Sequence, residues 1–179
     1  LQELVAAGTV KSVQSGSGLD LESVMMLKPD LILTFATDET TFDTHTQFDR
    51  AKLPAVLTSG YMEADPLARS EWIKVIGAFA QKETEADQVF SEIAERYERL
   101  RSLAETVETR PTVFTNAPFA GVWRLPGGQS YNAQALADAG ANYLWSDDTS
   151  SGGLPQDFEV ILYKASDADF WINPGSHET

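Results

Sequence analysis

The segment from Trp123 to Tyr131 combines residues that are suited to binding a bulky small molecule. Trp123 and Tyr131 offer flat apolar faces that carry a hydrogen-bonding group. Between them, Gly127 and Gly128 would let the backbone approach a ligand closely, because glycine has no side chain. The segment lacks the glycine and lysine spacing of a phosphate-binding loop. We therefore expect a ligand-contact loop here, and the alternative is a hairpin turn whose aromatic residues belong to the core.

Further candidate ligand contacts stand where predicted strands end. Phe35 and Thr37 follow an apolar strand in the first half of the chain, and Asn116 and Asn173 take the same place in the second half. The carboxyl ends of strands are where α/β sheets usually bind their ligands. These four residues are therefore predicted to contact the ligand.

Tyr61 and Arg69 follow the predicted strand that ends at Thr58 and are expected at the rim of the site in the first half. Arg69 could hold an anionic group, such as a carboxylate, through two parallel hydrogen bonds. The alternative for Arg69 is a solvated arginine on a helix.

Metal binding by protein side chains is not expected. Histidine occurs only as His45 and His177, which are far apart and have no pairing partner at helical spacing. The loop at Asp147 and Asp148 is rich in oxygen atoms but lacks the spacing of a calcium-binding loop. Catalysis is disfavoured as well, because neither a nucleophile elbow nor an acidic pair with an accompanying base is present. The prediction is a binding protein without a cofactor, a metal site or enzymatic activity.

The composition narrows the possible partners. The chain has 179 residues, of which 13 are basic and 27 are acidic, so its net charge is -14. Nucleic acids and anionic lipid surfaces demand clustered lysine and arginine, so both are disfavoured as partners. The sequence contains no cysteine, which excludes zinc ribbons, thiol nucleophiles and disulfide frameworks. An acidic protein of this kind fits a cationic partner surface or is simply soluble.

Short strands alternate with helices in both halves of the sequence, which is typical of a parallel α/β sheet. Asp20 is expected to cap a helix that ends near Leu27, because Pro29 disfavours helical geometry in the residue before it. A long helix at 83–107 is predicted from apolar residues that recur every three to four positions. The other expected helices are 40–50, 65–76, 132–139 and one after Asp157, and the expected strands are 10–14, 31–35, 54–58, 112–115, 142–145 and 169–172. Of these strands, 31–35 and 54–58 are expected to be buried, and Trp145 and Trp171 are expected to belong to the core.

The two halves share a pattern. Asp20-Leu21-Glu22 opens a helix that is followed by Asp30 and an apolar strand, and Asp157-Phe158-Glu159 opens a second such unit that is followed by Asp169. We interpret this as two structurally equivalent lobes joined by the long helix. The alternative is that helix–turn–strand units simply look alike.

The order and spacing of these pieces resemble the helix-bridged periplasmic substrate-binding proteins of ABC importers, a class that carries ferric siderophores, haem and vitamin B12. The resemblance covers nearly the whole chain, although no single motif decides it. The matching pieces are Leu21–Leu33, Leu53–Val56, Glu71–Gly77, the long helix with Ala86 and Tyr97, and the run from Arg110–Phe114 to Asp157–Glu159.

The resemblance implies an α/β fold of two Rossmann-like lobes with a ligand cleft between them and only modest closure. The expected division is an N-terminal lobe at 1–82, a bridging helix at 83–107 and a C-terminal lobe at 108–179, with the chain truncated at both ends. It also implies that one surface glutamate on each lobe docks onto arginines of the permease dimer. Those glutamates map to Glu22 and Glu159, for which the alternative is a surface charge that complements the helix dipole.

The expected function is capture of an iron chelate by a monomeric, periplasmic or otherwise extracytoplasmic protein, which could carry a lipid anchor, and delivery of that chelate to an ABC permease. Cobalamin or haem binding by the same scaffold is the alternative. A second alternative is a two-lobed α/β enzyme or regulator, which would need a titrating group in the cleft. A third is a structural protein without a ligand, whose cleft would be poor in exposed aromatic residues.

Overall fold

The computed structural model describes residues 2–11, 13–15, 18–36 and 44–173. Backbone contacts divide the chain into two compact units, Leu1–Ser59 and Gly60–Thr179. No helix in the described ranges has both the length and the apolar composition that a membrane span requires.

The first unit is a small α/β arrangement. Strands β3 and β4 pair in parallel, with Leu33 opposite Val56, and α3 connects them. The elements are α1 Gln2–Ala6, β1 Gln14–Ser15, β2 Gly18–Leu19, α2 Leu21–Leu27, β3 Ile32–Thr34, α3 His45–Arg50 and β4 Ala55–Leu57. The predicted α/β alternation is therefore confirmed here, and the part of the 40–50 helix before residue 44 lies outside the described residues.

Helix α2 begins and ends as its sequence predicts. The Asp20 carboxylate accepts hydrogen bonds from the backbone N–H of Ser23 at 3.1 Å and from the Ser23 hydroxyl. These bonds hold the pKa of Asp20 below its usual value, because they favour the ionised carboxylate. At the other end Lys28 adopts a left-handed conformation with φ 49°, and Pro29 follows it.

Two predictions for the first unit are wrong. The strand expected at 10–14 is absent from its described residues up to Val13, and antiparallel pairing begins only at Gln14. The strands expected to be buried are partly open, since Leu33 is 38% and Leu57 52% exposed. A two-stranded sheet has two faces, and the buried apolar residues Val24 and Phe48 of α2 and α3 are too few to cover both.

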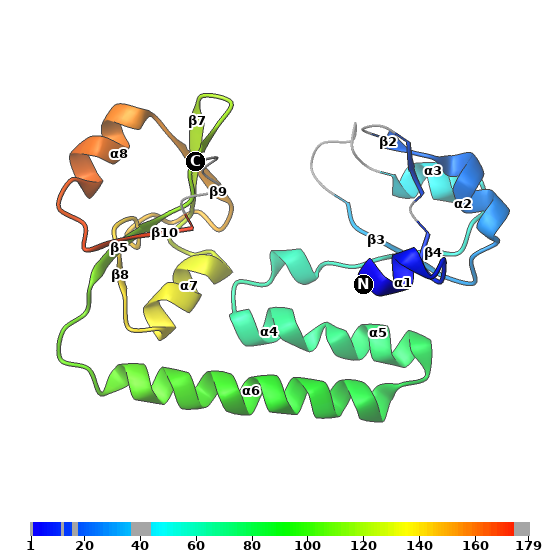
Figure 1. Ribbon diagram of the computed structural model, residues 1–179, viewed down its shortest axis with the longest axis horizontal. Helices are drawn as coiled ribbons and strands as arrows, with labels where there is room; N and C mark the ends of the chain where they lie inside the picture. Colours follow the sequence, from blue (N-terminus) through cyan, green and yellow to red (C-terminus); the bar gives the residue numbers. More distant parts are fainter. Residues whose placement is uncertain (1, 12, 16–17, 37–43, 174–179) are drawn as a thin grey trace. The chain divides into compact units, whose positions relative to one another are not determined.

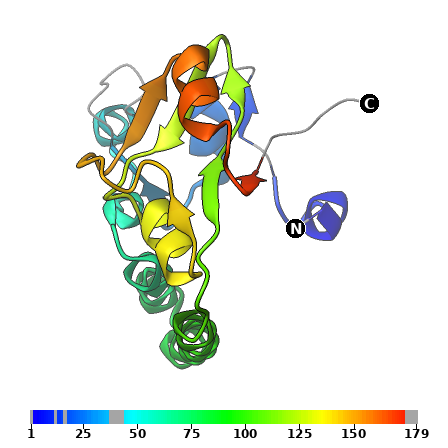
Figure 2. The same cartoon turned by 90° about the vertical axis from the view of Figure 1, so that its left-hand side faces the viewer.

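The second unit opens with a group of helices. The 3₁₀ helix η1 Gly60–Met62 precedes α4 Pro66–Glu71, α5 Ile73–Ala80 and the long α6 Glu83–Glu105. Helices α4 and α5 run alongside α6 in Figure 1, and Figure 2 shows the group nearly end-on. Gly77 allows the close approach of α5 and α6, because a Cβ atom there would overlap Ala86. The long helix is confirmed, whereas the helix expected at 65–76 is interrupted at Trp72, whose indole N–H donates to Glu63 at 3.0 Å.

The rest of the second unit contains two three-stranded sheets. One is parallel, in the order β10-β5-β8, and the other is antiparallel, in the order β6-β7-β9. The elements are β5 Thr112–Thr115, β6 Pro118–Phe119, β7 Val122–Pro126, α7 Tyr131–Asp138, β8 Asn142–Tyr143, β9 Gly153–Gln156, α8 Phe158–Ala165 and β10 Phe170–Ile172. Their buried core consists of Val113, Trp123, Leu125, Ala133, Tyr143, Trp145 and Ile161.

The antiparallel sheet was not predicted. Residues 123–126, expected in a loop, form most of β7, and neither β6 nor β9 was expected. Trp145 is buried, as predicted, although it lies in a turn. Trp171 is 42% exposed rather than fully in the core, because it lies on β10 at the edge of the parallel sheet.

Helices α4 and α5 fall within the second unit, while the expected division into lobes at 1–82, 83–107 and 108–179 stays a prediction. Helix α5 packs on α6, and α4 contacts both α6 and α7. The consequence for function is that Tyr61 and Arg69 lie in the same unit as Asn116, Tyr131 and Asn173.

Candidate functional site

A pocket of about 400 Å³ lies at the carboxyl ends of β5 and β10, beside the first turns of α7. Both strands belong to the parallel sheet, so their carboxyl ends meet at the same edge, where α/β proteins bind ligands. The pocket is lined by Thr115, Asn116, Pro126, Tyr131, Asn132, Ala135, Leu136, Ile172 and Asn173.

Asn116 and Asn173 form a matched pair at this edge. Each is the first residue after its strand, and each has a left-handed backbone, with φ 64° and φ 54°. The Asn173 amide donates to the Asn116 side-chain oxygen at 3.3 Å, and the Asn116 amide donates to the carbonyl of Arg124 at 2.7 Å. Asparagine tolerates this conformation better than most residues do. Asn116 and Asn173 therefore lie together at one edge of the parallel sheet, and their contact with a ligand stays a prediction.

Thr115, which lines the pocket, has an unsatisfied polar atom. The residue is 6% exposed, and its buried Oγ1 has no hydrogen-bond partner within the described ranges. Its carbonyl accepts the indole N–H of Trp123 at 2.9 Å. An unpaired buried hydroxyl costs about 1–3 kcal/mol, so a ligand that pairs with it would recover that energy.

Tyr131 begins α7 and forms one wall of the pocket. Ser130 caps the helix by accepting the N–H of Ala133 at 3.2 Å, which fixes the position of the first turn. The guanidinium of Arg69 lies 4.0 Å from the centre of the Tyr131 ring, and Arg69 also donates to the carbonyl of Tyr61 at 3.2 Å. Tyr61, Arg69 and Tyr131 are therefore linked, although only Tyr131 lines the pocket.

Gly127 and Gly128, the two glycines before Tyr131, lie close against the loop at 145–150. A Cβ atom on Gly127 would overlap Ser150, and one on Gly128 would overlap the carbonyls of Trp145 and Asp148. They allow the strand end to pack against the protein's own loop, and their contact with a ligand stays a prediction.

Asp148 holds that packed loop together. Its carboxylate accepts the hydroxyl and the N–H of Ser150, and the N–H of Gly128 lies 3.4 Å away. The Ser150 hydroxyl contributes most to holding the pKa of Asp148 below its usual value, and the Ser150 N–H follows. On the core side, the hydroxyl of Tyr143 donates a hydrogen bond of 2.7 Å to the carbonyl of Pro126. Burial raises the pKa of Tyr143. The segment between Pro126 and Tyr131 is thus fixed from two sides.

The structure gathers some predicted contacts and separates others. Asn116, Tyr131 and Asn173 line one pocket, whereas Trp123 is 4% exposed in the core, as in the hairpin alternative. Phe35 belongs to the first unit, and Thr37 lies outside the described residues. Thr115 and Asn132, which also line the pocket, were not predicted, because a lone threonine or asparagine in an α/β sequence carries no distinguishing signal.

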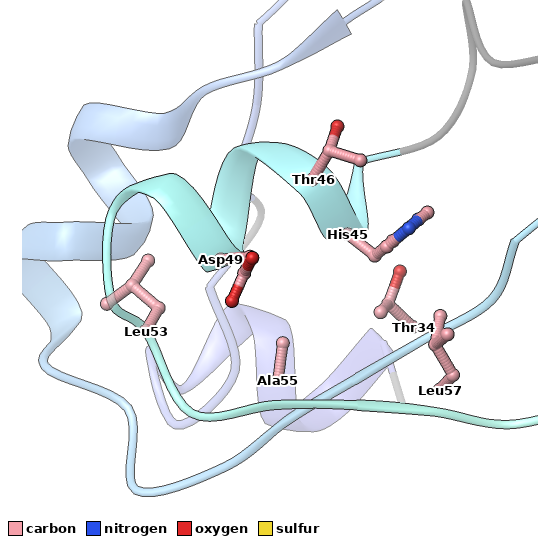
Figure 3. Close-up of a pocket in the computed structure, with 7 residues that line it drawn as sticks. All are labelled: Thr34, His45, Thr46, Asp49, Leu53, Ala55 and Leu57. Atoms are coloured by element: carbon pink, nitrogen blue, oxygen red, sulfur yellow. The ribbon is translucent and has the colours of Figure 1, made fainter.

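The first unit has a smaller pocket of about 230 Å³ between α3 and the strands β3 and β4. His45 and Asp49 lie one helical turn apart on the side of α3 that faces the strands (Figure 3). The buried Nδ1 of His45 has no hydrogen-bond partner in the described part of the chain. No group of three or more metal-binding side chains occurs among the described residues, so His45 and Asp49 have no third such ligand there.

Glu22 and Glu159 occupy equivalent positions in their helices. Each is the second residue of a short helix, α2 or α8, each follows an N-terminal aspartate, and each is exposed. The helix in each case leads to a strand that pairs in parallel with its neighbour. The repeated pattern in the sequence therefore corresponds to a repeated local structure, one copy in each unit.

Comparison with known proteins agrees with this arrangement. A family model described as periplasmic binding protein matches residues 2–178. A curated relative, an uncharacterised lipoprotein of Methanocaldococcus jannaschii, is 25% identical over 98% of this chain and 42% of its own length.

Three solved structures share the fold. An ABC transporter substrate-binding protein from Listeria monocytogenes has a TM-score of 0.73 at 21% identity and matches 99% of this chain and 65% of its own. A periplasmic heme binding protein from Pseudomonas aeruginosa has a TM-score of 0.72 at 21% identity, matching 99% and 62%. A periplasmic vitamin B12 binding protein of Vibrio cholerae has a TM-score of 0.63 at 12% identity, matching 88% and 59%.

This chain spans about two fifths of the length of its curated relative and less than two thirds of these three solved structures. The match to the family model nevertheless covers almost every residue, and the fold comparison agrees with it. The predicted α/β fold, the long helix and the periplasmic location are thereby confirmed. The chain belongs to the periplasmic binding protein family.

Proposed function

We propose that this protein is the solute-binding component of an ABC importer and that it captures an iron chelate of the siderophore kind. The observation that carries the proposal is the pocket formed where Asn116 and Asn173 end two parallel strands, with Tyr131 as its wall. Its volume of about 400 Å³ lies within the range of pockets that hold small-molecule ligands.

The arrangement favours binding over catalysis. Catalysis by acid–base chemistry needs a positioned group that titrates near the working pH. The residues that line the pocket carry amides, hydroxyls and apolar side chains, and none of them is a histidine, a carboxylate or an amine. A role as an enzyme or cofactor-dependent regulator therefore has less support from this site than ligand capture has.

Cobalamin or haem capture by the same scaffold is the second candidate. It is favoured by two proteins that share the fold, one a periplasmic heme binding protein and the other a periplasmic vitamin B12 binding protein. Their identity to this chain is 21% and 12%, so the ligand does not transfer with the fold.

Delivery of the ligand is proposed to use Glu22 and Glu159. Both carboxylates are exposed, and the protein as a whole carries a net charge of -14. Negative groups of this kind steer a protein toward a basic surface and set its orientation there. The proposed partner is the permease dimer of the importer, contacted through one glutamate from each unit.

The ligand is identified by tryptophan fluorescence of the full chain, titrated with a ferric siderophore, haemin or cyanocobalamin. Trp171 is a suitable reporter, because its indole N–H donates to the carbonyl of Asn116 at 2.6 Å. Saturable quenching by one ligand class is expected, and Tyr131→Ala is expected to weaken that binding about tenfold or more. Tyr163→Ala is the matched control, since Tyr163 lies on α8 and is 89% exposed. If none of the three ligands binds, the proposed function is wrong.

A further inference from the structure

We infer that the pocket at β5 and β10 selects a ligand that presents neutral amide or hydroxamate groups, rather than carboxylates, phosphates or catecholates. This inference rests on the proposed function, because it names the chemistry of the solute that the same pocket would take. It follows from the charge of the pocket lining, an unpaired hydroxyl at Thr115 and the position of Arg69.

The lining of the pocket is polar but uncharged. Its polar side chains are those of Thr115, Asn116, Tyr131, Asn132 and Asn173, and the remaining four residues are apolar. An anion that leaves water needs a cation or several N–H donors to offset the lost hydration. An amide or hydroxamate needs only single hydrogen bonds, which these side chains offer.

Three of these side chains retain unused hydrogen-bonding capacity. The buried Oγ1 of Thr115 has no partner, and the exposed side chain of Asn132 makes no hydrogen bond within the described residues. The amide of Asn173 donates to Asn116, which leaves its own carbonyl oxygen as an acceptor. A hydroxyl and a carboxamide each offer both donors and acceptors, and so they match a group that also has both.

The arginine near the pocket does not line it. Arg69 stacks on Tyr131 and donates to the carbonyl of Tyr61. Tyr131 itself is among the residues that line the pocket, whereas Arg69 is not. The protein's net charge of -14 further opposes the approach of a strongly anionic chelate. The prediction that Arg69 pairs with an anionic group of the ligand is therefore replaced by a role in holding Tyr131.

Two kinds of solute carry the required groups. In a ferric trihydroxamate the hydroxamates balance the charge of the iron, which leaves a neutral complex with carbonyl groups on its surface. In a corrinoid the edge of the ring carries carboxamide side chains. The two share one recognition chemistry, and a direct comparison of their binding distinguishes them.

The test measures the affinity of the full chain for four probes by fluorescence quenching at fixed ionic strength. The probes are a neutral ferric trihydroxamate, cyanocobalamin, a strongly anionic ferric tris-catecholate and haemin with its two propionates. Binding of the trihydroxamate or of cyanocobalamin, at least about tenfold tighter than both anionic probes, is expected. Tighter binding of the tris-catecholate overturns this inference and leaves the proposed function intact. Tighter binding of haemin overturns this inference and favours the second candidate function. A failure of all four probes to bind overturns both.

A pair of variants at Thr115 tests the pocket itself. Thr115→Val keeps the shape of the side chain and removes Oγ1, and it is expected to weaken binding of the neutral probe about threefold to tenfold. Thr115→Ser keeps the hydroxyl and is expected to retain most of the affinity. The thermal stability of the ligand-free Thr115→Val protein should stay level or rise, because the hydroxyl that it loses is unpaired. Unchanged affinity of Thr115→Val for the neutral probe would contradict the inference.

Discussion

The guanidinium of Arg69 lies over the ring of Tyr131, with its central carbon 4.0 Å from the ring centre. The contact joins α4 to α7, two helices that are separated by the whole of α5 and α6 in the sequence. Because Tyr131 forms a wall of the candidate pocket, the contact connects the helical half of the second unit to the ligand site.

Arg69→Met is expected to weaken ligand binding about twofold to fivefold, because a cation–π contact at a partly exposed site contributes about 0.5–1 kcal/mol to the position of the ring. Arg69→Lys keeps the charge and should restore part of the loss. Titration of each variant with the ligand identified for the parent protein measures the effect. Arg99→Met on the exposed side of α6 is the matched control and should bind as the parent does.

Tyr97 on α6 is expected to make folding stability fall at alkaline pH. Its hydroxyl donates to Asp138 at 2.6 Å, and its pKa is raised, first by burial and then by this bond to a carboxylate. The unfolded chain releases the tyrosine proton above a pH of about 10, while the folded chain retains it. The contribution of Tyr97 is therefore complete below that pH and is lost as the pH rises further.

Tyr97→Phe should lower the free energy of unfolding by about 1–3 kcal/mol at neutral pH and make the alkaline decline less steep. Tyr143, whose pKa burial also raises, would maintain part of that decline. Denaturant unfolding followed at several pH values measures both effects, and Tyr163→Phe on the exposed face of α8 is the control. An equal alkaline slope in Tyr97→Phe and the parent would show that the contact does not set the pH dependence.

Gly128→Ala is expected to destabilise the protein by about 1–3 kcal/mol, because the added Cβ would overlap the carbonyls of three residues in the 145–148 turn. Gly152→Ala is the natural control, since nothing lies within 4 Å of a Cβ at that position. Thermal unfolding of the two variants should differ by several degrees. Similar melting temperatures for both would mean that the turn moves aside without cost.

Reversing the charge of both Glu22 and Glu159 to lysine is expected to abolish uptake of the ligand by cells that carry the cognate importer, while ligand affinity stays unchanged. The reason is that both carboxylates are exposed and that neither residue lines the pocket. A double reversal at Glu95 and Glu108, which are also exposed, changes the net charge equally and serves as control. Normal uptake by the Glu22 and Glu159 variant would refute the docking assignment.

Local structure in this protein follows closely from local sequence. Asp20 caps the helix that it was expected to cap, Asp65 caps α4, and Pro29 and Pro66 stand where a helix ends or begins. The long helix was predicted at 83–107 and spans Glu83–Glu105. These features depend on hydrogen bonds and dihedral restrictions between residues a few positions apart, which the sequence displays directly.

The edge of the sheet was also predictable, because parallel strands place their ends together. Asn116 and Asn173 were selected only as the residues after two expected strands, and they are hydrogen-bonded to one another. They were chosen because ligands usually bind at the carboxyl ends of strands. Ile172 of β10 pairs with Thr115 of β5, so the residues that follow these two lie side by side.

Only the tertiary structure decided which residues of each strand and loop line the pocket and which belong to the core. Trp123 and Tyr131 looked equivalent as aromatic residues near two glycines, yet one is in the core and the other lines the pocket. The unpredicted pairing of β7 with β6 and β9 turns Trp123 inward, where its indole N–H finds the carbonyl of Thr115. Strand pairing depends on partners distant in the sequence, and no local pattern displays it.

The sequence by itself determined the class of fold, the long helix and the repeated glutamates, because each of these is a property of short segments. The tertiary structure decided the composition of the pocket, the role of Gly127 and Gly128, and the stacking of Arg69 on Tyr131. Those features arise from packing between segments that are distant in the sequence. The role of a residue there depends on the groups that surround it, such as a neighbouring backbone carbonyl, and on whether its own polar atoms are paired, as the hydroxyl of Thr115 is not.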